Sequence, residues 1–92
     1  MNFEWDPGKA ASNLAKHGVA FDEAATVFAD FNGLTIFDPD HSEDEDRFIT
    51  VGLSADGRLL TVCHTDRDDR IRMINARKAD RHETRWYTDE RS

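Results

Sequence analysis

The chain has 92 residues and a net charge of −7, and these features exclude several classes of protein. The length fits one small domain, so we expect a single domain over residues 1–92. Cys63 is the only cysteine, which excludes an intramolecular disulfide and a zinc site built from several thiolates. A signal peptide and an apolar run of membrane-spanning length are both absent, so we expect a cytoplasmic protein.

The acidic side chains are concentrated in the first half of the chain. Residues 1–46 hold two basic and eleven acidic side chains, whereas residues 47–92 hold ten basic and eight acidic ones. Between Arg58 and Arg81, seven basic residues stand against four acidic ones. Because contacts with phosphate need lysine and arginine, an anion-binding site is expected in this second half.

The first elements expected along the chain are a strand and two helices. Residues Phe3–Trp5 alternate between apolar and polar, and Asp6 with the proline after it suits an N-cap and a first helical position. A helix is therefore expected over Pro7–Lys16, ending at Gly18, because glycine favours the left-handed C′ position. The helical spacing of apolar side chains predicts a second helix over residues 21–28.

Four strands and one helix are expected in the rest of the chain. A short strand over Leu34–Phe37 precedes a loop, Asp38–Asp46, that carries six acids and no apolar residue. An antiparallel meander then follows, with strands expected at Arg47–Ser54, Arg58–Thr65 and Arg70–Ile74. Asn75 is expected to cap a last helix over Ala76–Tyr87. The order β-α-α-β-β-β-β-α predicts an α+β fold, a mostly antiparallel sheet with the helices packed on one face.

Several short motifs follow one another in a fixed order over nearly the whole chain. They are Phe3-Glu4-Trp5-Asp6-Pro7 with Lys9, Asn13-Leu14-Ala15-Lys16-His17-Gly18-Val19, Phe21-Asp22-Glu23-Ala24 with Val27-Phe28, Asp46–Ser54, Gly57–Val62, His64-Thr65 ahead of Arg67, and Arg70–Ala79 with Glu83 and Tyr87. Taken together, these motifs resemble the BrnT family of type II toxins.

The resemblance implies a function as well as a fold. It implies a RelE-like fold and metal-independent cleavage of mRNA that inhibits translation and arrests growth, with no cofactor and no membrane partner. It also implies a BrnA-like antitoxin that neutralises the toxin in a hetero-oligomer, so that this chain meets operator DNA only through the antitoxin. The net acidity leaves a second function open, a non-catalytic toxin-like module that acts with an antitoxin in operon repression.

Metal-free cleavage of RNA uses the 2′-hydroxyl of the substrate as nucleophile. The protein must then supply a base, an acid and cations that stabilise the charge on phosphate. The candidate catalytic residues are His64, Arg72, Arg77 and Glu83. The candidate RNA- or phosphate-binding residues are Arg67, Arg70, Lys78, Lys16 and His17. No metal site is expected, because the histidines lack further clustered ligands.

The candidates on the strands also have simpler structural explanations. A hairpin is expected to bring His64 close to Arg70 or Arg72, but a half-buried strand histidine with one hydrogen bond fits the same position. Arg72 is expected on the strand face opposite Ile71 and Met73. There it either binds phosphate through its planar guanidinium or forms a salt bridge with an acid.

The candidates near helix ends have simpler explanations of the same kind. Arg77 and Lys78 are expected in the first turn of the last helix, where acidic side chains would suit the helix dipole better than basic ones. Residues that depart from such a local preference are often functional, so these two either contact RNA or an antitoxin, or they are simply charged surface residues. His17 lies at a helix end, where a basic side chain complements the dipole without any catalytic role. Glu83 either acts as a base or pairs with an arginine one turn away.

Overall fold

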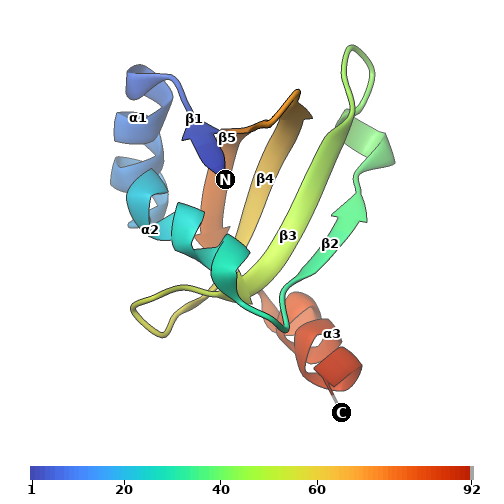
Figure 1. Ribbon diagram of the computed structural model, residues 1–92. Coiled ribbons are helices and arrows are strands. Elements are labelled where there is room, and N and C mark those ends of the chain that lie inside the picture. The colour runs from blue at the N-terminus through green and yellow to red at the C-terminus, as the bar shows by residue number, and fades with distance from the viewer. Residues whose placement is uncertain (92) are drawn as a thin grey trace.

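A five-stranded sheet runs through the centre of the computed structural model, which describes the backbone of residues 1–91 and the side chains of residues 1–89 (Figure 1). Its spatial order is β1-β5-β4-β3-β2, in which β1 and β5 are parallel and all other neighbours are antiparallel. The strands are β1 (Asn2–Glu4), β2 (Leu34–Phe37), β3 (Arg47–Leu53), β4 (Leu59–Arg67) and β5 (Arg70–Lys78). The helices are α1 (Pro7–His17), α2 (Phe21–Thr26) and α3 (Arg81–Arg91), with short 3-10 helices η1 (Val27–Ala29) and η2 (Pro39–His41). The predicted element order and the α+β class are confirmed.

Local sequence signals determine both ends of α1, as predicted. The Asp6 side chain accepts a hydrogen bond from the Lys9 backbone N–H at 2.9 Å and caps the first turn, with Pro7 beginning the helix. Gly18 follows the helix at φ 69°, a left-handed conformation that glycine adopts without a Cβ clash. The second helix is shorter than predicted. The α-helix α2 ends at Thr26, and the next three residues form the 3-10 helix η1, which has fewer residues per turn.

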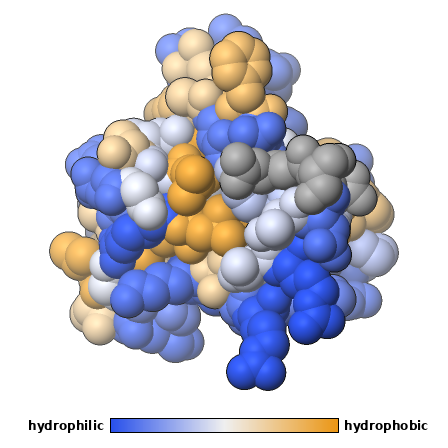
Figure 2. Space-filling view, turned by 90° about the horizontal axis from the view of Figure 1, so that it is seen from below, coloured by the Kyte–Doolittle hydropathy of each residue, from blue (hydrophilic) through white to orange (hydrophobic). Residues whose placement is uncertain are grey.

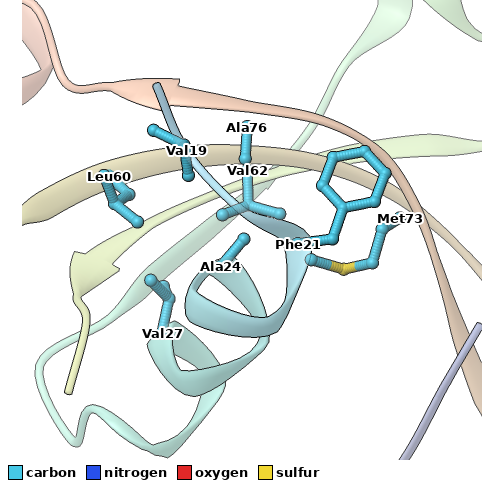
Figure 3. Close-up of a cluster of buried hydrophobic side chains, with 8 residues drawn as sticks. All are labelled: Val19, Phe21, Ala24, Val27, Leu60, Val62, Met73 and Ala76. Atoms are coloured by element: carbon cyan, nitrogen blue, oxygen red, sulfur yellow. The ribbon is translucent and has the colours of Figure 1, made fainter. Parts of the chain in front are cut away.

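The main apolar core lies between the sheet and the pair α1 and α2, which cover one of its faces (Figures 1 and 3). The buried cluster comprises Val19, Phe21, Ala24, Val27, Leu60, Val62, Met73 and Ala76. Burying each of its larger side chains stabilises the fold by roughly 1.5–3 kcal/mol. Gly52 lets η1 approach β3 closely, because a Cβ atom there would lie 2.8 Å from Val27 Cγ1.

The third helix, α3, packs against the opposite face of the sheet near one end (Figure 1). Thr61 lies between Leu60 and Val62, which point into the core, so strand alternation directs its side chain to the other face. There its hydroxyl donates to Glu83 Oε1 of α3 at 2.8 Å. The expectation that the helices share one face therefore holds for α1 and α2, whereas α3 lies across the sheet. Within residues 1–91, the helices are too short or too polar to cross a membrane.

The predicted role of Asn75 as a helix cap is wrong, because β5 continues past it to Lys78. Ala76 pairs with Val62 of β4 and is completely buried in the core cluster. The hydrogen-bonded pairing of β5 with β4 and the burial of Ala76 outweigh the preference of Asn75 for a helix-capping position. Arg77 and Lys78 are consequently strand residues, and the prediction that they lie in the first turn of a helix is wrong.

The last helix is capped five residues later than predicted, by Asp80. Its Oδ1 accepts a hydrogen bond from the Glu83 backbone N–H at 2.8 Å, and Glu83 Oε1 accepts one from the Asp80 backbone N–H at 2.9 Å. These reciprocal bonds form a capping box, which satisfies two N–H groups at the start of α3. The spacing of Asp80 and Glu83 was readable from the sequence.

Candidate functional site

Two different elements lie along the outer edge of β5. β1 pairs only with residues 70–72, and α1 lies beside the rest of that edge. Asn13 of α1 makes the connection, because its Nδ2 donates to Ala76 O at 2.8 Å and its Oδ1 accepts from Ala76 N–H at 3.0 Å. Nδ2 also donates to Val19 O at 2.9 Å. One buried side chain thus replaces a missing strand neighbour and fixes α1 against β5.

A groove of about 650 Å³ lies between α1 and β5. Its walls are formed by Asp6, Gly8, Lys9, Ser12, Asn13, Lys16, His17, Ile74, Asn75 and Arg77. Lys9, Lys16 and Arg77 contribute positive charge, His17 adds an imidazole, and Asp6 is the carboxylate that caps α1. The groove is therefore basic although the whole chain carries −7, and its donors are of the kind that bind phosphate.

Arg77 reaches the groove from β5 and is held by Glu83 of α3. Two guanidinium N–H groups donate to the two carboxylate oxygens at 2.7 Å each, and Thr61 Oγ1 donates to Glu83 Oε1 at 2.8 Å. Burial alone raises the pKa of Glu83, but the hydrogen bonds from Arg77, the Asp80 backbone and Thr61 outweigh it and lower this pKa to about 2. Glu83 is thus a carboxylate that positions Arg77 and is a poor proton acceptor at neutral pH.

His64 lies outside the groove, within the core between η1 and β3. The residue is 2% exposed, with Nε2 at 2.8 Å from Thr50 Oγ1 and Nδ1 at 3.0 Å from Asp66 Oδ1. Phe28 and Phe48 flank the ring, with centroid distances of 4.9 and 5.9 Å. Burial lowers the pKa of His64, and Asp66 opposes this effect in part. These contacts match a structural role for this histidine better than a catalytic one.

The predicted contact of His64 with Arg70 or Arg72 is wrong. His64 pairs with Met73 on β5, because the register between the two strands shifts next to it. Arg70 and Arg72 lie on the opposite face of the sheet, where each donates to Glu4 at 3.2 Å. Arg72 does lie on the face opposite Met73, as predicted, and its contacts are those of a salt bridge.

Two further candidates lie away from the groove. Arg67, at the end of β4, forms an exposed ion pair with Glu45 at 3.1 Å. Lys78 is exposed at the end of β5. Their roles as RNA contacts stay predictions, as does that of Arg70.

The groove brings Lys16 and His17, predicted at the end of the first helix, together with Arg77, predicted about sixty residues later in the chain. Lys9 was missed as a candidate phosphate ligand, although Lys16 on the same helix was predicted. A signal for it was present, because Lys9, Asn13 and Lys16 are spaced i, i+4 and i+7 and share one face of α1. The pattern alone did not indicate which part of the sheet that face meets.

Comparisons with known proteins agree with this fold. The chain is similar to the crystal structure of the ribonuclease toxin BrnT of Brucella abortus, with a TM-score of 0.64 and 21% sequence identity. The alignment covers 88% of this chain and 99% of that protein, and at this identity it supports the fold. Curated protein sequences give no match. A family model described as "Ribonuclease toxin, BrnT, of type II toxin-antitoxin system" matches residues 5–83. The match spans most of the chain, and the chain therefore belongs to the BrnT family of ribonuclease toxins.

Proposed function

We propose that this chain is a metal-independent endoribonuclease that binds the RNA backbone in the groove between α1 and β5. The observation that carries the proposal is the charge of that groove. Three cationic side chains, one of them Arg77 in its pair with Glu83, line it together with one imidazole and the carboxylate of Asp6, on a chain with a net charge of −7. Protein contacts with the RNA backbone rest on lysine and arginine at phosphates, so the groove attracts RNA whereas the acidic loop after β2 repels it.

His17 is the acid–base group in this proposal. Its imidazole accepts the proton of a 2′-hydroxyl, and the resulting oxygen attacks the adjacent phosphorus and displaces the 5′-oxygen. The leaving 5′-oxygen takes up a proton from the imidazolium or from water, which gives a 2′,3′-cyclic phosphate and a 5′-hydroxyl. Lys16 and Arg77 stabilise the negative charge that develops on the phosphate, and Lys9 binds a neighbouring phosphate.

A protein partner completes the proposal. A BrnA-like antitoxin neutralises the toxin in a cytoplasmic hetero-oligomer, and the complex reaches operator DNA through the antitoxin. Membership of a family of type II toxins supports a protein antitoxin. The net charge of −7 supports a basic partner and disfavours direct contact of this chain with DNA.

The test is to measure growth and RNA integrity after induced expression of this chain, alone and together with the protein encoded by the neighbouring gene. We expect growth arrest with RNA cleavage by the chain alone, and rescue by the neighbour. Loss of the acid–base group in His17→Ala should lower the cleavage rate about 100-fold. Arg85→Ala is the matched control, because Arg85 is exposed on α3 outside the groove. Normal growth with intact RNA, from folded protein, would contradict the proposal.

A non-catalytic module that acts with the antitoxin in repression is the second candidate. One observation favours it. Two predicted acid–base groups, His64 and Glu83, are held in hydrogen-bond networks and have pKa values below their ordinary ones, which leaves His17 as the groove residue for proton transfer. If this module is the function, RNA stays intact on expression while a stable complex with the neighbouring protein still forms.

A further inference from the structure

The edge of the sheet formed by β2 has no strand beside it within residues 1–91. β2 is the last strand in the spatial order, and no other strand within residues 1–91 pairs with its outer side. Natural proteins usually protect such edges by keeping the edge strand very short, or with charged residues, proline or a bulge, and of these devices β2 has only its shortness. The four residues of β2, Leu34-Thr35-Ile36-Phe37, include neither charge nor proline, and the strand pairs with β3 in unbroken register. This edge is therefore able to accept another strand.

Exposed apolar side chains gather along and beside β2. Ile36 and Phe37 are each 47% exposed, and Phe31, three residues before the strand, is fully exposed. Leu53 is 40% exposed and lies close to the same segment, because its backbone N–H donates to Asp30 Oδ2 at 2.8 Å. Figure 2 shows apolar residues gathered at the end of the molecule where α3 lies. Apolar surface of this kind commonly marks a protein interface.

A cavity beside β2 could select a partner by the shape of one of its side chains. It has a volume of about 350 Å³ and lies between β2, β3 and α3, where Ile36, Ile49 and Trp86 form its apolar part. His82 and Glu83 complete it, and Glu83 is already occupied by Arg77, Thr61 and the Asp80 backbone. A cavity of this size and lining accepts an apolar side chain from a strand placed beside β2.

The charge next to β2 indicates the chemistry of the partner. The loop after the strand carries four exposed carboxylates that make no ion pair with any side chain described in residues 1–89, namely Asp40, Glu43, Asp44 and Asp46. Such a cluster attracts lysine and arginine and repels RNA. A second copy of this chain would bring two acidic loops together, so self-association through β2 is disfavoured.

We propose that β2 binds an extended basic segment of the antitoxin, which adds a sixth strand to the sheet. An apolar side chain of that segment fills the cavity at Trp86, and its lysine or arginine side chains lie against the loop of residues 38–46. Main-chain hydrogen bonds supply affinity, and the cavity and loop supply specificity. The inference rests on the proposed antitoxin, but it places the antitoxin on the side of the sheet away from the RNA groove.

The test uses the complex of this chain with the protein encoded by its neighbouring gene. Hydrogen exchange of backbone amides should slow at least about tenfold in residues 34–37 on complex formation, because the added strand binds them. The loop variant Asp40→Asn/Glu43→Gln/Asp44→Asn/Asp46→Asn should raise the dissociation constant at least about tenfold at low salt and weaken its salt dependence. Ile36→Lys, which places a cation on the edge, should also weaken the complex.

A matched control separates local charge from total charge. Asp22→Asn/Asp56→Asn/Asp68→Asn/Asp69→Asn removes the same number of exposed carboxylates from other parts of the chain and should leave the dissociation constant within about twofold. Unchanged exchange in residues 34–37, equal weakening by both sets of substitutions, or no complex at all would overturn the inference. RNA cleavage is measured separately, so a chain that forms the β2 complex without cleaving RNA would contradict the proposed function alone.

Discussion

The β5 and β2 edges of the sheet differ in the charge of the surface beside them and in whether the outer backbone groups have hydrogen-bond partners. At β5, the buried Asn13 satisfies the backbone of Ala76, and a basic groove lies beside it. At β2 no strand pairs with the outer edge in residues 1–91, apolar side chains are exposed, and an acidic loop follows. The net charge of −7 thus averages two surfaces of opposite charge, and the partner proposed for each surface is argued from its local charge.

The largest expected effect concerns the β5 edge. Asn13→Ala removes three hydrogen bonds and leaves buried backbone groups of Ala76 and Val19 without partners. We expect the free energy of unfolding to fall by about 3 kcal/mol, measured by urea denaturation. Ser12→Ala is the control, because Ser12 is the exposed neighbour on the same helix. A loss below about 1 kcal/mol would mean that water replaces the amide and that α1 is not fixed through this residue.

The second effect concerns the charge pair behind the basic groove. The pKa of Glu83 is about 2 in the folded protein, below its ordinary value of 4.5, so the ion pair with Arg77 and the hydrogen bonds from Thr61 and the Asp80 backbone stabilise the fold above about pH 4.5. This contribution is lost as the pH falls from about 4.5 to about 2. Because Arg77 is about one-third exposed, we expect roughly 1–2 kcal/mol after screening.

Glu83→Gln tests this contribution. Urea denaturation between pH 2 and 5 should show a flatter dependence of stability on pH than in the unmodified chain, since the variant has no carboxylate to protonate. The matched control is Glu43→Gln, an exposed residue of the acidic loop. Part of the slope should persist in the variant, because the ion pair with Arg58 also lowers the pKa of Glu23. Identical slopes for all three proteins would argue against a structural role of the Arg77–Glu83 pair.

A smaller effect concerns single phosphate contacts in the groove. If Lys9 binds one phosphate, Lys9→Ala should make the slope of log affinity for single-stranded RNA against log salt less steep by about 0.7. The measurement is a fluorescence titration with a short uncleavable RNA at several salt concentrations. Arg85→Ala, at an exposed position of α3 outside the groove, should leave the slope unchanged. Equal changes for both variants would show that the affinity for RNA depends on the total charge of the chain and not on the groove.

The smallest effect concerns the β2 edge. The Thr35 hydroxyl bonds to Thr50 Oγ1 at 2.7 Å, but the Thr35 residue is exposed and Thr50 keeps its bond to His64. We expect Thr35→Ala to lower the free energy of unfolding by only about 0.5 kcal/mol, because a water molecule can replace the Thr35 hydroxyl as hydrogen-bond partner of Thr50 Oγ1. Thermal unfolding of Thr35→Ala and Asn13→Ala under the same conditions compares the stability lost at the two edges. A loss as large as that of Asn13→Ala would remove the energetic distinction between them.

Elements with local signals were predictable from the sequence. The aspartate and glycine at the two ends of α1 specify that helix, and the turn at Gly57, with φ 81°, joins β3 to β4 as the Asp-Gly pair predicted. The end of β5 was not predictable in this way. Two residue types able to cap a helix, Asn75 and Asp80, lie close together, and only pairing with β4 decides between them.

The candidate site was predictable in residue type but not in arrangement. The sequence by itself determined the family and the element order, and it predicted lysine, histidine and arginine as phosphate ligands. Tertiary structure decided which of them meet, because Asn13 and Ala76 are 63 residues apart in sequence and their contact brings α1 beside Arg77. It also buried His64, through a register shift between β4 and β5. Local rules act through neighbouring backbone groups, whereas these placements depend on contacts between distant segments that form only when the sheet is assembled.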